Sequence, residues 1–484
     1  MKNLFVCMVT LLFPLCGVAQ SDVASKLEVY PAPAGVELKH DFEVKVRRPG
    51  GEWQTLDTYA VKVDRVADAR HNVENASLAY FDFDGEVEVS VAHRAAPVHT
   101  YKIRPLSYDI PSRLDGHTIT FKLDRPRNLS VEVNGDIFHN LHLFANPIDE
   151  AKPQKPRKAK GMIYFGPGIH RLPNDSLSVP SGSSVYIAGG ARVFGTLYVT
   201  DAHDVSIRGR GIIHPEGRGA GVVIKRSKRV EVEGIISTQV PVGESDSVSV
   251  RRVKVISSYG WGDGLNVFAS SRVLFDGVFC RNSDDCTTVY ATRLGHRGSC
   301  KDITMQNSTL WADVAHPIMI GIHGDADHGD TIEDLRYVNI DILDHKEQQL
   351  DYQGCFAINA GDNNLIRNIR FENIRVEDFR QGQLVNIRIF YNKKYCAAPG
   401  RSIENVLFRN ITYQGSHAEV SQIAGYNEER TVKNIRFENL TINGTLIYDD
   451  MPGKPKWYQT GDMARIHVGA HVENVSFVKT EELH

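Results

Sequence analysis

The chain has 484 residues, which is long enough for two or three domains of average size. Its formal net charge is −3, and this near balance argues against a nucleic acid or a strongly anionic membrane surface as the partner. Charged residues make up 24% and apolar residues 42% of the chain, a composition that excludes a disordered protein and is ordinary for a globular one.

Residues 1–20, MKNLFVCMVTLLFPLCGVAQ, have the pattern of a secretory signal peptide. A lysine at the second position precedes an apolar run from Leu4 to Leu15, and small residues follow. We expect cleavage near Ala19 or Gln20, with lipidation at Cys16 as the alternative. No other stretch approaches the roughly 20 apolar residues of a membrane-spanning helix, so no transmembrane segment is expected. The sequence therefore predicts an exported protein that is secreted, periplasmic or attached to the cell surface.

Beyond the signal peptide five cysteines remain, too few for a disulfide framework in so long a chain. Their spacing matches no zinc site, so we expect most of them to be buried as small apolar side chains. A bridge between Cys280 and Cys286, or between Cys286 and Cys300, is the alternative in an oxidising compartment. The five are Cys280, Cys286, Cys300, Cys355 and Cys396.

Short alternating strands occupy the chain from about Leu27 to Phe144. Turn residues separate them and no helical period appears, which predicts a small antiparallel β-sandwich as an amino-terminal domain over residues 21–150. The next segment, EAKPQKPRKAKG (150–161), is polar and rich in Pro and Lys, as in a linker. The clearest of the predicted strands are FEVKVRR, EVEVSVAH, TITFKL and LSVEV.

After the linker the sequence repeats one unit, an alternating β-branched strand, a Gly or Asn turn and a second strand. The interval varies from 18 residues, between Val230 and Val248, to 40 residues, between Val432 and Val472. Recurrent FEN and FRN triplets place asparagine at equivalent turns, where it tolerates a left-handed backbone and can form a polar ladder. All-β repeats of this size indicate a solenoid. The irregular interval favours a right-handed parallel β-helix over a propeller, and we expect it to occupy residues 161–484.

The segment NSDDC places two acids side by side in a strand-rich region, where acids are poor strand formers. Asp263, in WGDGLNV, lies 21 and 22 residues before Asp284 and Asp285, which is about one coil. Because coils stack at about 4.8 Å, the three carboxylates are expected on one face. Hydrolysis of a glycosidic bond needs such a set, with one acid protonated and another ionised to activate water. Mutual repulsion would keep one of them protonated near neutral pH.

The following segment, DVAHPIMIGIHGD, is expected to bring two histidines to the same face. His316 is suited to orient a carboxylate or to bind a sugar hydroxyl. Trp261 and Tyr290 flank the acids as a platform for a sugar ring, although ordinary packing explains them equally well. The predicted substrate-binding residues are His316, His323, Trp261, Asn266, Tyr290 and Asn359.

The loop after His323 is rich in acids and contains Asp325, Asp327, His328 and Asp330. A solvated edge is the expected role of this loop, and a metal site is the alternative. We expect no metal and no cofactor in the reaction.

At these motifs the chain resembles the parallel β-helix glycoside hydrolases, namely the polygalacturonases (family 28) and the dextranase and isopullulanase group (family 49). The polygalacturonase strands NTDG, DD and HG correspond to WGDGLNV, NSDDC and AHPIMIG here. The likeness to the dextranase group covers more of the chain, because that group also carries an amino-terminal β-sandwich. Segments YKIRPLSYDI, LHLFANP and IYFGPGIHRL are similar to the entry into its helix. The resemblance implies inverting hydrolysis by Asp263, Asp284 and Asp285.

One departure from the polygalacturonases bears on the substrate. They hold the galacturonate carboxylate with an Arg-x-Lys pair, whereas the corresponding coil here, YQGCFAINAGDN, has none. We therefore expect a neutral α-linked glycan, such as an α-glucan, with Gln353 and Asn359 offering hydrogen bonds to its hydroxyls. Because Arg388 can bind an anionic group, an acidic or sulfated glycan is the alternative substrate.

Our mechanistic hypothesis makes Asp284 the general acid and lets Asp263 and Asp285 activate the water, although Asp284 and Asp285 could exchange roles. One rival is a polysaccharide lyase, which would need a basic residue among the acids. Another is a non-catalytic glycan-binding β-helix, which gives no reason for acids on adjacent coils. The expected partner is a polysaccharide or oligosaccharide; the sequence leaves its sugar, the choice of endo or exo action and the oligomeric state open.

Overall fold

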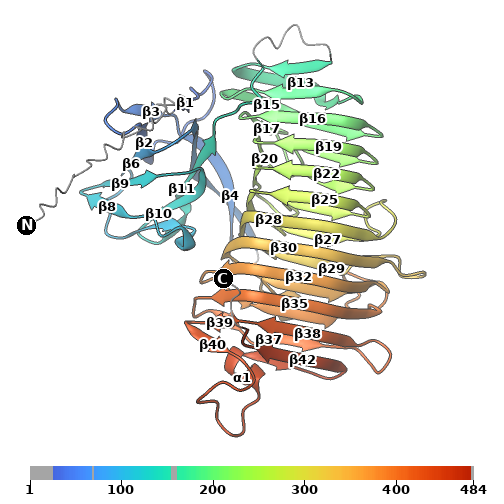
Figure 1. The fold of residues 1–484 in the computed structure, drawn as a ribbon. Helices are drawn as coiled ribbons and strands as arrows, with labels where there is room; N and C mark the ends of the chain where they lie inside the picture. The colour runs from blue at the N-terminus through green and yellow to red at the C-terminus, as the bar shows by residue number, and fades with distance from the viewer. Residues whose placement is uncertain (1–25, 68–69, 154–160, 481–484) are drawn as a thin grey trace, which may run out of the picture.

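The computed structural model describes residues 26–67, 70–153 and 161–480. These residues form two parts that lie side by side, an amino-terminal pair of sheets and a long solenoid of parallel strands (Figure 1). The predicted signal peptide, residues 1–20, and residues 154–160 of the predicted linker lie outside the described residues. Within the described ranges, no helix is both long and apolar enough to cross a membrane. The predicted fold class is confirmed.

The amino-terminal part is a sandwich of two sheets around a common apolar core. Buried and half-buried residues alternate along β2, the period of two that lets one face of a strand enter a core. The pairing departs from a purely antiparallel sandwich at β5 and β11, which run parallel. One sheet contains β1 (Leu27–Val29), β4 (Tyr59–Ala67), β5 (Arg70–Phe83), β7 (Tyr101–Arg104), β10 (Arg127–Val133) and β11 (Asp136–Pro147). The other contains β2 (Phe42–Arg47), β3 (Gln54–Leu56), β6 (Val87–His93), β8 (Ser112–Asp115) and β9 (Thr118–Leu123).

The solenoid has three parallel faces, which we call the ladder sheet, the interdomain sheet and the site sheet. The ladder sheet contains β14 (Ser184–Ile187), β16 (His203–Gly209), β19 (Lys228–Glu233), β22 (Asp246–Arg251), β25 (Ser271–Asp276), β28 (Cys300–Ala312), β30 (Thr331–Asp344), β32 (Leu365–Val376), β35 (Ser402–Tyr413), β38 (Val432–Glu438) and β42 (Val472–Val478). The interdomain sheet contains β17 (Ile212–His214), β20 (Ile236–Ser237), β23 (Lys254–Ile256), β26 (Phe279–Asn282), the second halves of β28, β30, β32 and β35, and β39 (Leu440–Ile442). The site sheet contains β18 (Val222–Lys225), β21 (Val242–Gly243), β24 (Leu265–Phe268), β27 (Thr287–Tyr290), β29 (Ile318–Gly321), β31 (Phe356–Ala360), β34 (Val385–Ile389), β37 (Ser421–Ala424) and β41 (Ile466–Val468).

Shorter elements complete the chain. The strands β12 (Met162–Phe165), β13 (Gly168–Ser178) and β15 (Ala191–Thr200) begin the solenoid, and β33 (Gly382–Gln383), β36 (Ala418–Glu419) and β40 (Thr445–Ile447) lie in its later connections. Helical structure is confined, among the described residues, to α1 (Thr460–Ala464) and short 3-10 turns that include Leu106–Tyr108 and Leu350–Tyr352.

The solenoid core is a continuous column of inward-facing aliphatic and aromatic side chains. Phe371, Phe408, Phe437 and Phe477 stack with ring centroids 4.8 Å apart, the spacing of adjacent strands, so each coil adds one ring. The five cysteines named above are free and buried, which confirms their expected role and leaves neither considered bridge formed.

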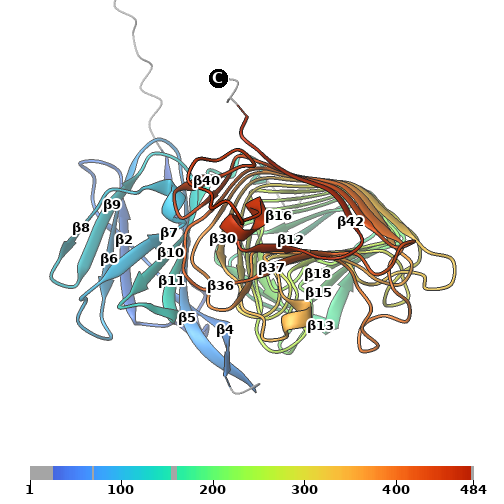
Figure 2. The same cartoon turned by 90° about the horizontal axis from the view of Figure 1, so that it is seen from below.

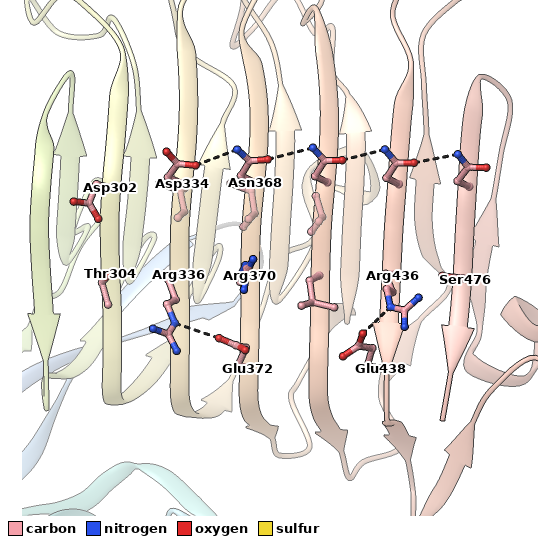
Figure 3. A pocket seen from close by; sticks show the side chains of 17 residues that line it. Asp302, Thr304, Asp334, Arg336, Asn368, Arg370, Glu372, Arg436, Glu438 and Ser476 are labelled. Carbon is pink, nitrogen blue, oxygen red and sulfur yellow. Dashed lines mark hydrogen bonds and ion pairs between the residues drawn. The ribbon is translucent and has the colours of Figure 1, made fainter. Parts of the chain in front are cut away.

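Asparagines of the FEN and FRN triplets form the predicted polar ladder, in which Asn410 donates to Asn373 over 2.9 Å and Asn439 donates to Asn410 over 3.0 Å. A second ladder, which the triplets did not predict, runs along the ladder sheet (Figure 3). The amide of Asn405 donates to Asn368 over 3.2 Å, and the amide of Asn434 donates to Asn405 over 3.0 Å. Asn368, Asn405 and Asn434 have φ between 56° and 59°, the left-handed region that asparagine tolerates better than most residues. Beside the ladder, a shallow polar groove carries paired charges such as Arg336 and Glu372, whose side chains are 3.2 Å apart.

The amino-terminal sandwich packs against the interdomain sheet, beside the solenoid rather than at its end (Figure 2). Phe144 meets Phe279 with ring centroids 5.1 Å apart. Arg281, which is fully buried, pairs with Asp313 at 2.9 Å and donates to Asn140 of the sandwich at 2.8 Å. Because Arg281 lies at the end of β26, this contact anchors the backbone that leads directly into NSDDC.

Candidate active site

The acids lie just before β24 and β27 of the site sheet. Leu265 pairs with Thr287, and the amide of Gly264 donates to the carbonyl of Asp285 over 2.8 Å, so this register places Asp263 beside Asp285. The next strand continues the stack, because the amide of Cys286 donates to the carbonyl of His316 over 2.8 Å. The structure thus brings together the three acids and His316, as the spacing of one coil predicts.

The local chain is shaped for close stacking at this point. A Cβ on Gly264 would clash with the carbonyl oxygen of Cys286 and with the Asn282 side chain. The Asn282 amide in turn donates to the hydroxyl of Ser257 over 2.8 Å. Glycine therefore allows the Asp263 segment to approach the NSDDC turn, which is why WGDGLNV has glycines on both sides of its acid.

Asp285 is buried and accepts three hydrogen bonds. Its Oδ1 accepts from Nδ1 of His316 at 2.7 Å and from the His316 amide at 3.1 Å, and its Oδ2 accepts from the Tyr290 hydroxyl at 2.9 Å. The other ring nitrogen of His316 lies 2.7 Å from the carbonyl oxygen of Tyr352, which can only accept, so Nε2 carries a proton. Protonation of Nδ1 as well turns His316 into an imidazolium that donates to Oδ1 of Asp285 over 2.7 Å.

The charge of His316 is consistent with its surroundings. Burial by itself disfavours the imidazolium, but the charge and the hydrogen bond of Asp285 outweigh it, and the pKa of His316 is raised above its ordinary value. His316 is fully buried. Of the two roles predicted for it, the structure favours orientation of a carboxylate, because a fully buried ring cannot reach a sugar hydroxyl.

Asp284 and Asp263 both hold their protons more tightly than ordinary carboxyls. Burial, then the charges of Asp263 and Asp285, raise the pKa of Asp284 well above its usual range. Burial and the charge of Asp285 raise the pKa of Asp263 to about 7, although the Asn266 amide donates to its Oδ2 over 2.7 Å. The cluster therefore combines Asp285, which contacts a histidine, with two carboxyls that hold their protons more tightly than usual.

Two aromatic residues predicted as platforms occupy different positions. The Trp261 side chain is 82% exposed, and its backbone amide donates to Asp284 over 3.3 Å. This hydrogen bond holds the exposed indole ring beside the acid cluster. Tyr290 is only 6% exposed and lies behind Asp285. The prediction of a surface platform is therefore wrong for Tyr290, because its hydroxyl is used to hold the carboxylate.

The remaining predicted binding residues are largely covered. His323 packs edge-on against Tyr290 with centroids 4.9 Å apart, and burial followed by the charge of Arg293 lowers its pKa to about 3. Asn359 is fully buried and donates to the Asn386 side chain over 3.0 Å. Gln353 is also fully buried and donates to the carbonyl of Glu347. Direct contact of Asn359 or Gln353 with a sugar is not compatible with this burial.

The acidic loop uses its carboxylates to bind its own backbone. Asp325 accepts from the His328 amide at 3.1 Å, and Asp330 accepts from the Asp325 amide at 2.8 Å. In the described ranges no group of three or more His, Cys, Asp or Glu side chains is arranged to hold a metal ion.

Sequence patterns did not reveal two supports of the site, Tyr352 and the Arg281–Asp313 pair. Tyr352 comes from an irregular segment, and its ring lies edge-on to the His316 ring at 4.5 Å. Arg281 directly precedes NSDDC, but nothing in the sequence shows that an arginine there is buried against a distant domain. Charged residues are almost never fully buried unless they are paired. The burial of Arg281 could not be predicted because the sequence does not show that Asp313 is its partner.

The model of the glycosyl hydrolases family 28 matches residues 222–453, which contain all three aspartates and His316. No curated protein sequence matches the chain. Among solved structures, Dex49A from Penicillium minioluteum is similar with a TM-score of 0.59 and 12% identity, over 93% of this chain and 96% of that one. A family 28 exopolygalacturonase from Yersinia enterocolitica gives a TM-score of 0.48 and 12% identity, over 81% of this chain and 96% of that one.

These structural similarities, at such low identity, concern the fold alone. The family model matches just under half of the chain and supports an enzyme of the glycoside hydrolase class. The resemblance to parallel β-helix glycoside hydrolases is thus confirmed.

Proposed function

We propose that this glycoside hydrolase cleaves O-glycosidic bonds of a neutral α-linked glycan, such as an α-glucan, with inversion at the anomeric carbon. One observation carries the proposal: Asp285 lies 2.7 Å from Nδ1 of the buried His316, while the pKa of Asp284, one residue away, is raised well above its usual range. An acid that keeps its proton beside a carboxylate that has lost it is the pair that glycoside hydrolysis requires.

In the proposed mechanism Asp284 donates its proton to the leaving oxygen. A water attacks the anomeric carbon from the other side, and either Asp285 or the ionised form of Asp263, which gains population as pH approaches about 7, takes one proton from it. Both oxygens of Asp285 already accept hydrogen bonds from buried donors, His316 and Tyr290, which makes Asp285 a poor covalent nucleophile. This arrangement favours attack by water and therefore inversion.

The preference for a neutral sugar rests on the cations near the site. Arg388, the residue that kept an acidic glycan as an alternative, pairs with Asp351 at 2.6 Å and donates to Gln422 at 3.2 Å. Its charge is already balanced within the protein. The exposed Trp261 ring offers an apolar face on which a neutral pyranose can stack.

Arg293 supports an acidic glycan as the second candidate. Its side chain is exposed and has no hydrogen bond or ion pair among the described residues. Its charge acts on Asp263, whose pKa it lowers against the larger effects of burial and Asp285. A carboxylate or sulfate on a sugar bound beside Asp263 would form an ion pair with Arg293.

We further infer that residues 161–484 form the catalytic domain, with residues 21–150 as a separate supporting domain, and that the enzyme is exported through the signal peptide predicted in residues 1–20. Support for the first inference is that every acid of the cluster lies on the solenoid. Export suits a polymeric substrate, which does not enter a cell intact.

The test is a panel of neutral and acidic polysaccharides, scored for new reducing ends and for the anomer first formed. We expect release from an α-glucan and a product of inverted configuration. A product that retains configuration would contradict the mechanism. Turnover of acidic polymers alone, lost in Arg293→Ala, would replace the first candidate with the second. Products that carry an unsaturated sugar would instead indicate a lyase.

A further inference from the structure

The site sheet is covered on one side of the acids. In β29, β31 and β34 the residues on either side of each outward position point into the solenoid core, which identifies Met319, Ala357, Asn359, Asn386 and Arg388 as outward-facing. Arg388 is partly exposed, but the other four are 0% exposed. A sugar chain that continued past His316 along the solenoid axis would have to lie over these residues, and it cannot.

Two segments, residues 345–355 and 390–399, cover them, and we call these the closing segments. Tyr352 and Tyr395 stack between the segments with centroids 4.6 Å apart, and both pack in an apolar cluster with Met319 and Ala357. The Tyr395 hydroxyl donates to Gln349 over 2.8 Å. Apolar packing and hydrogen bonds therefore join the closing segments into one wall.

The wall stands directly beside the acids. The Tyr352 carbonyl accepts from His316, and His316 contacts Asp285, so the covering begins one coil, about 4.8 Å, beyond Asp285. The Arg388–Asp351 pair holds the first closing segment to the outward face of β34. Little more than the length of one sugar residue is left between the acids and the wall.

The coils on the other side of the acids differ. In the outward row that continues from Met319, the residues Asn266, Pro241 and Val223 are each partly exposed. In the neighbouring outward row Lys225 is partly exposed, whereas Phe268 and Gly243 are buried. Along the first row the sheet is thus accessible before Asp263 and covered after His316. A site with one open end accommodates the end of a chain but not its middle.

We propose that the enzyme acts on chain ends, and that the closing segments determine this specificity by blocking the site one coil beyond the acids. The proposal rests on the proposed hydrolase function, because chain-end action has meaning only for a polymer that is cleaved at this site.

The experiment follows the size distribution of a polysaccharide that the enzyme degrades, together with the reducing ends released. We expect one small product to accumulate while the remaining polymer keeps its length. A steep early fall in average chain length at low conversion would overturn the proposal. Absence of reducing ends from every polymer would instead count against the proposed function, so the two failures are distinguishable.

A variant with both Tyr352→Ala and Tyr395→Ala opens the wall without changing an acid. The ratio of internal to terminal cleavage should rise at least several-fold, whatever the total rate. Tyr391→Ala is the matched control, because Tyr391 is exposed in the same segment and contacts Tyr426 rather than the wall. If the double variant melts like the wild type and its ratio is unchanged, the closing segments do not set the specificity.

Discussion

The ladder sheet and the site sheet are built from the same coils, yet they treat charge in opposite ways. On the ladder sheet, arginines and glutamates alternate between stacked strands, as in Arg409, which pairs with Glu372 at 3.1 Å and with Glu438 at 2.6 Å. On the site sheet the same stacking brings like charges together. The acids there have no lysine or arginine ion pair among the described residues, and Asp285 has only His316.

This contrast separates a structural surface from a chemical one. Because strands stack at a fixed spacing, opposite charges on neighbouring strands stabilise the sheet. On a face that serves only the fold, arginine and glutamate side chains therefore form ion pairs. On a face that keeps unpaired acids, the pKa values of the carboxyls are raised and the folded state is less stable. Such unfavourable local arrangements are expected at functional sites. Four changes test the comparison, taken here in order of their expected effect on activity.

The largest effect is expected from replacing the acid that holds the proton. Asp284→Asn should lower kcat by about 10²- to 10⁴-fold, the usual contribution of a general acid, with little loss of thermal stability. The measurement is kcat on the degraded polymer together with a melting curve. Glu372→Gln is the matched control, because it changes a carboxylate of the ladder sheet whose charge is paired. An Asp284→Asn enzyme of nearly full activity would remove Asp284 from the mechanism.

A smaller effect is expected from the residue that holds Asp285. Tyr290→Phe removes one hydrogen bond to an ionised group, so we expect kcat to fall about tenfold. Tyr337→Phe is the control, since the buried Tyr337 hydroxyl has no hydrogen-bond partner within the described structure. A loss of kcat in Tyr337→Phe as large as that in Tyr290→Phe would mean that Tyr290 contributes only packing.

The pH dependence of stability tests the cost of the unpaired acids. The folded state raises the pKa of Asp263 to about 7 from an ordinary value of 3.8, so folding favours its protonated form. The stability that this proton contributes is complete below about pH 4 and is lost as pH rises through about 7. Asp263→Asn should therefore melt about 2 °C or more above the wild type at pH 8. The difference should vanish near pH 4; an equal difference at both pH values would show that charge is not its cause.

No effect on activity is expected from the ladder. Asn405→Ala removes two side-chain hydrogen bonds and places alanine at a φ of 58°, so we expect a loss of about 1–3 kcal/mol in the free energy of unfolding. Denaturant titration measures it. Asn405→Gly, which accepts this backbone, should lose less than Asn405→Ala. A fall in kcat in either variant would show that the two sheets are coupled, against the comparison.

Much of the architecture was predictable because it depends on local spacing. The alternating strands predict the sandwich, the asparagine triplets predict the ladder, and the interval of 21 and 22 residues predicts that Asp263 meets Asp284 and Asp285. Each follows from the period of two in a strand and the fixed distance between coils. The parallel pairing of β5 with β11 was missed, because strand patterns do not state which neighbours pair.

The sequence by itself therefore determined a solenoid whose acids share one face, since strand spacing fixes which residues stack. Only the tertiary structure decided that burial raises the pKa of Asp263 and Asp284, that Tyr290 turns inward to Asp285, and that residues 345–355 and 390–399 cover one side of the site sheet. These outcomes depend on burial and on side chains from irregular segments far along the chain. No periodicity encodes such contacts, because they arise only when the coils and their connections pack together.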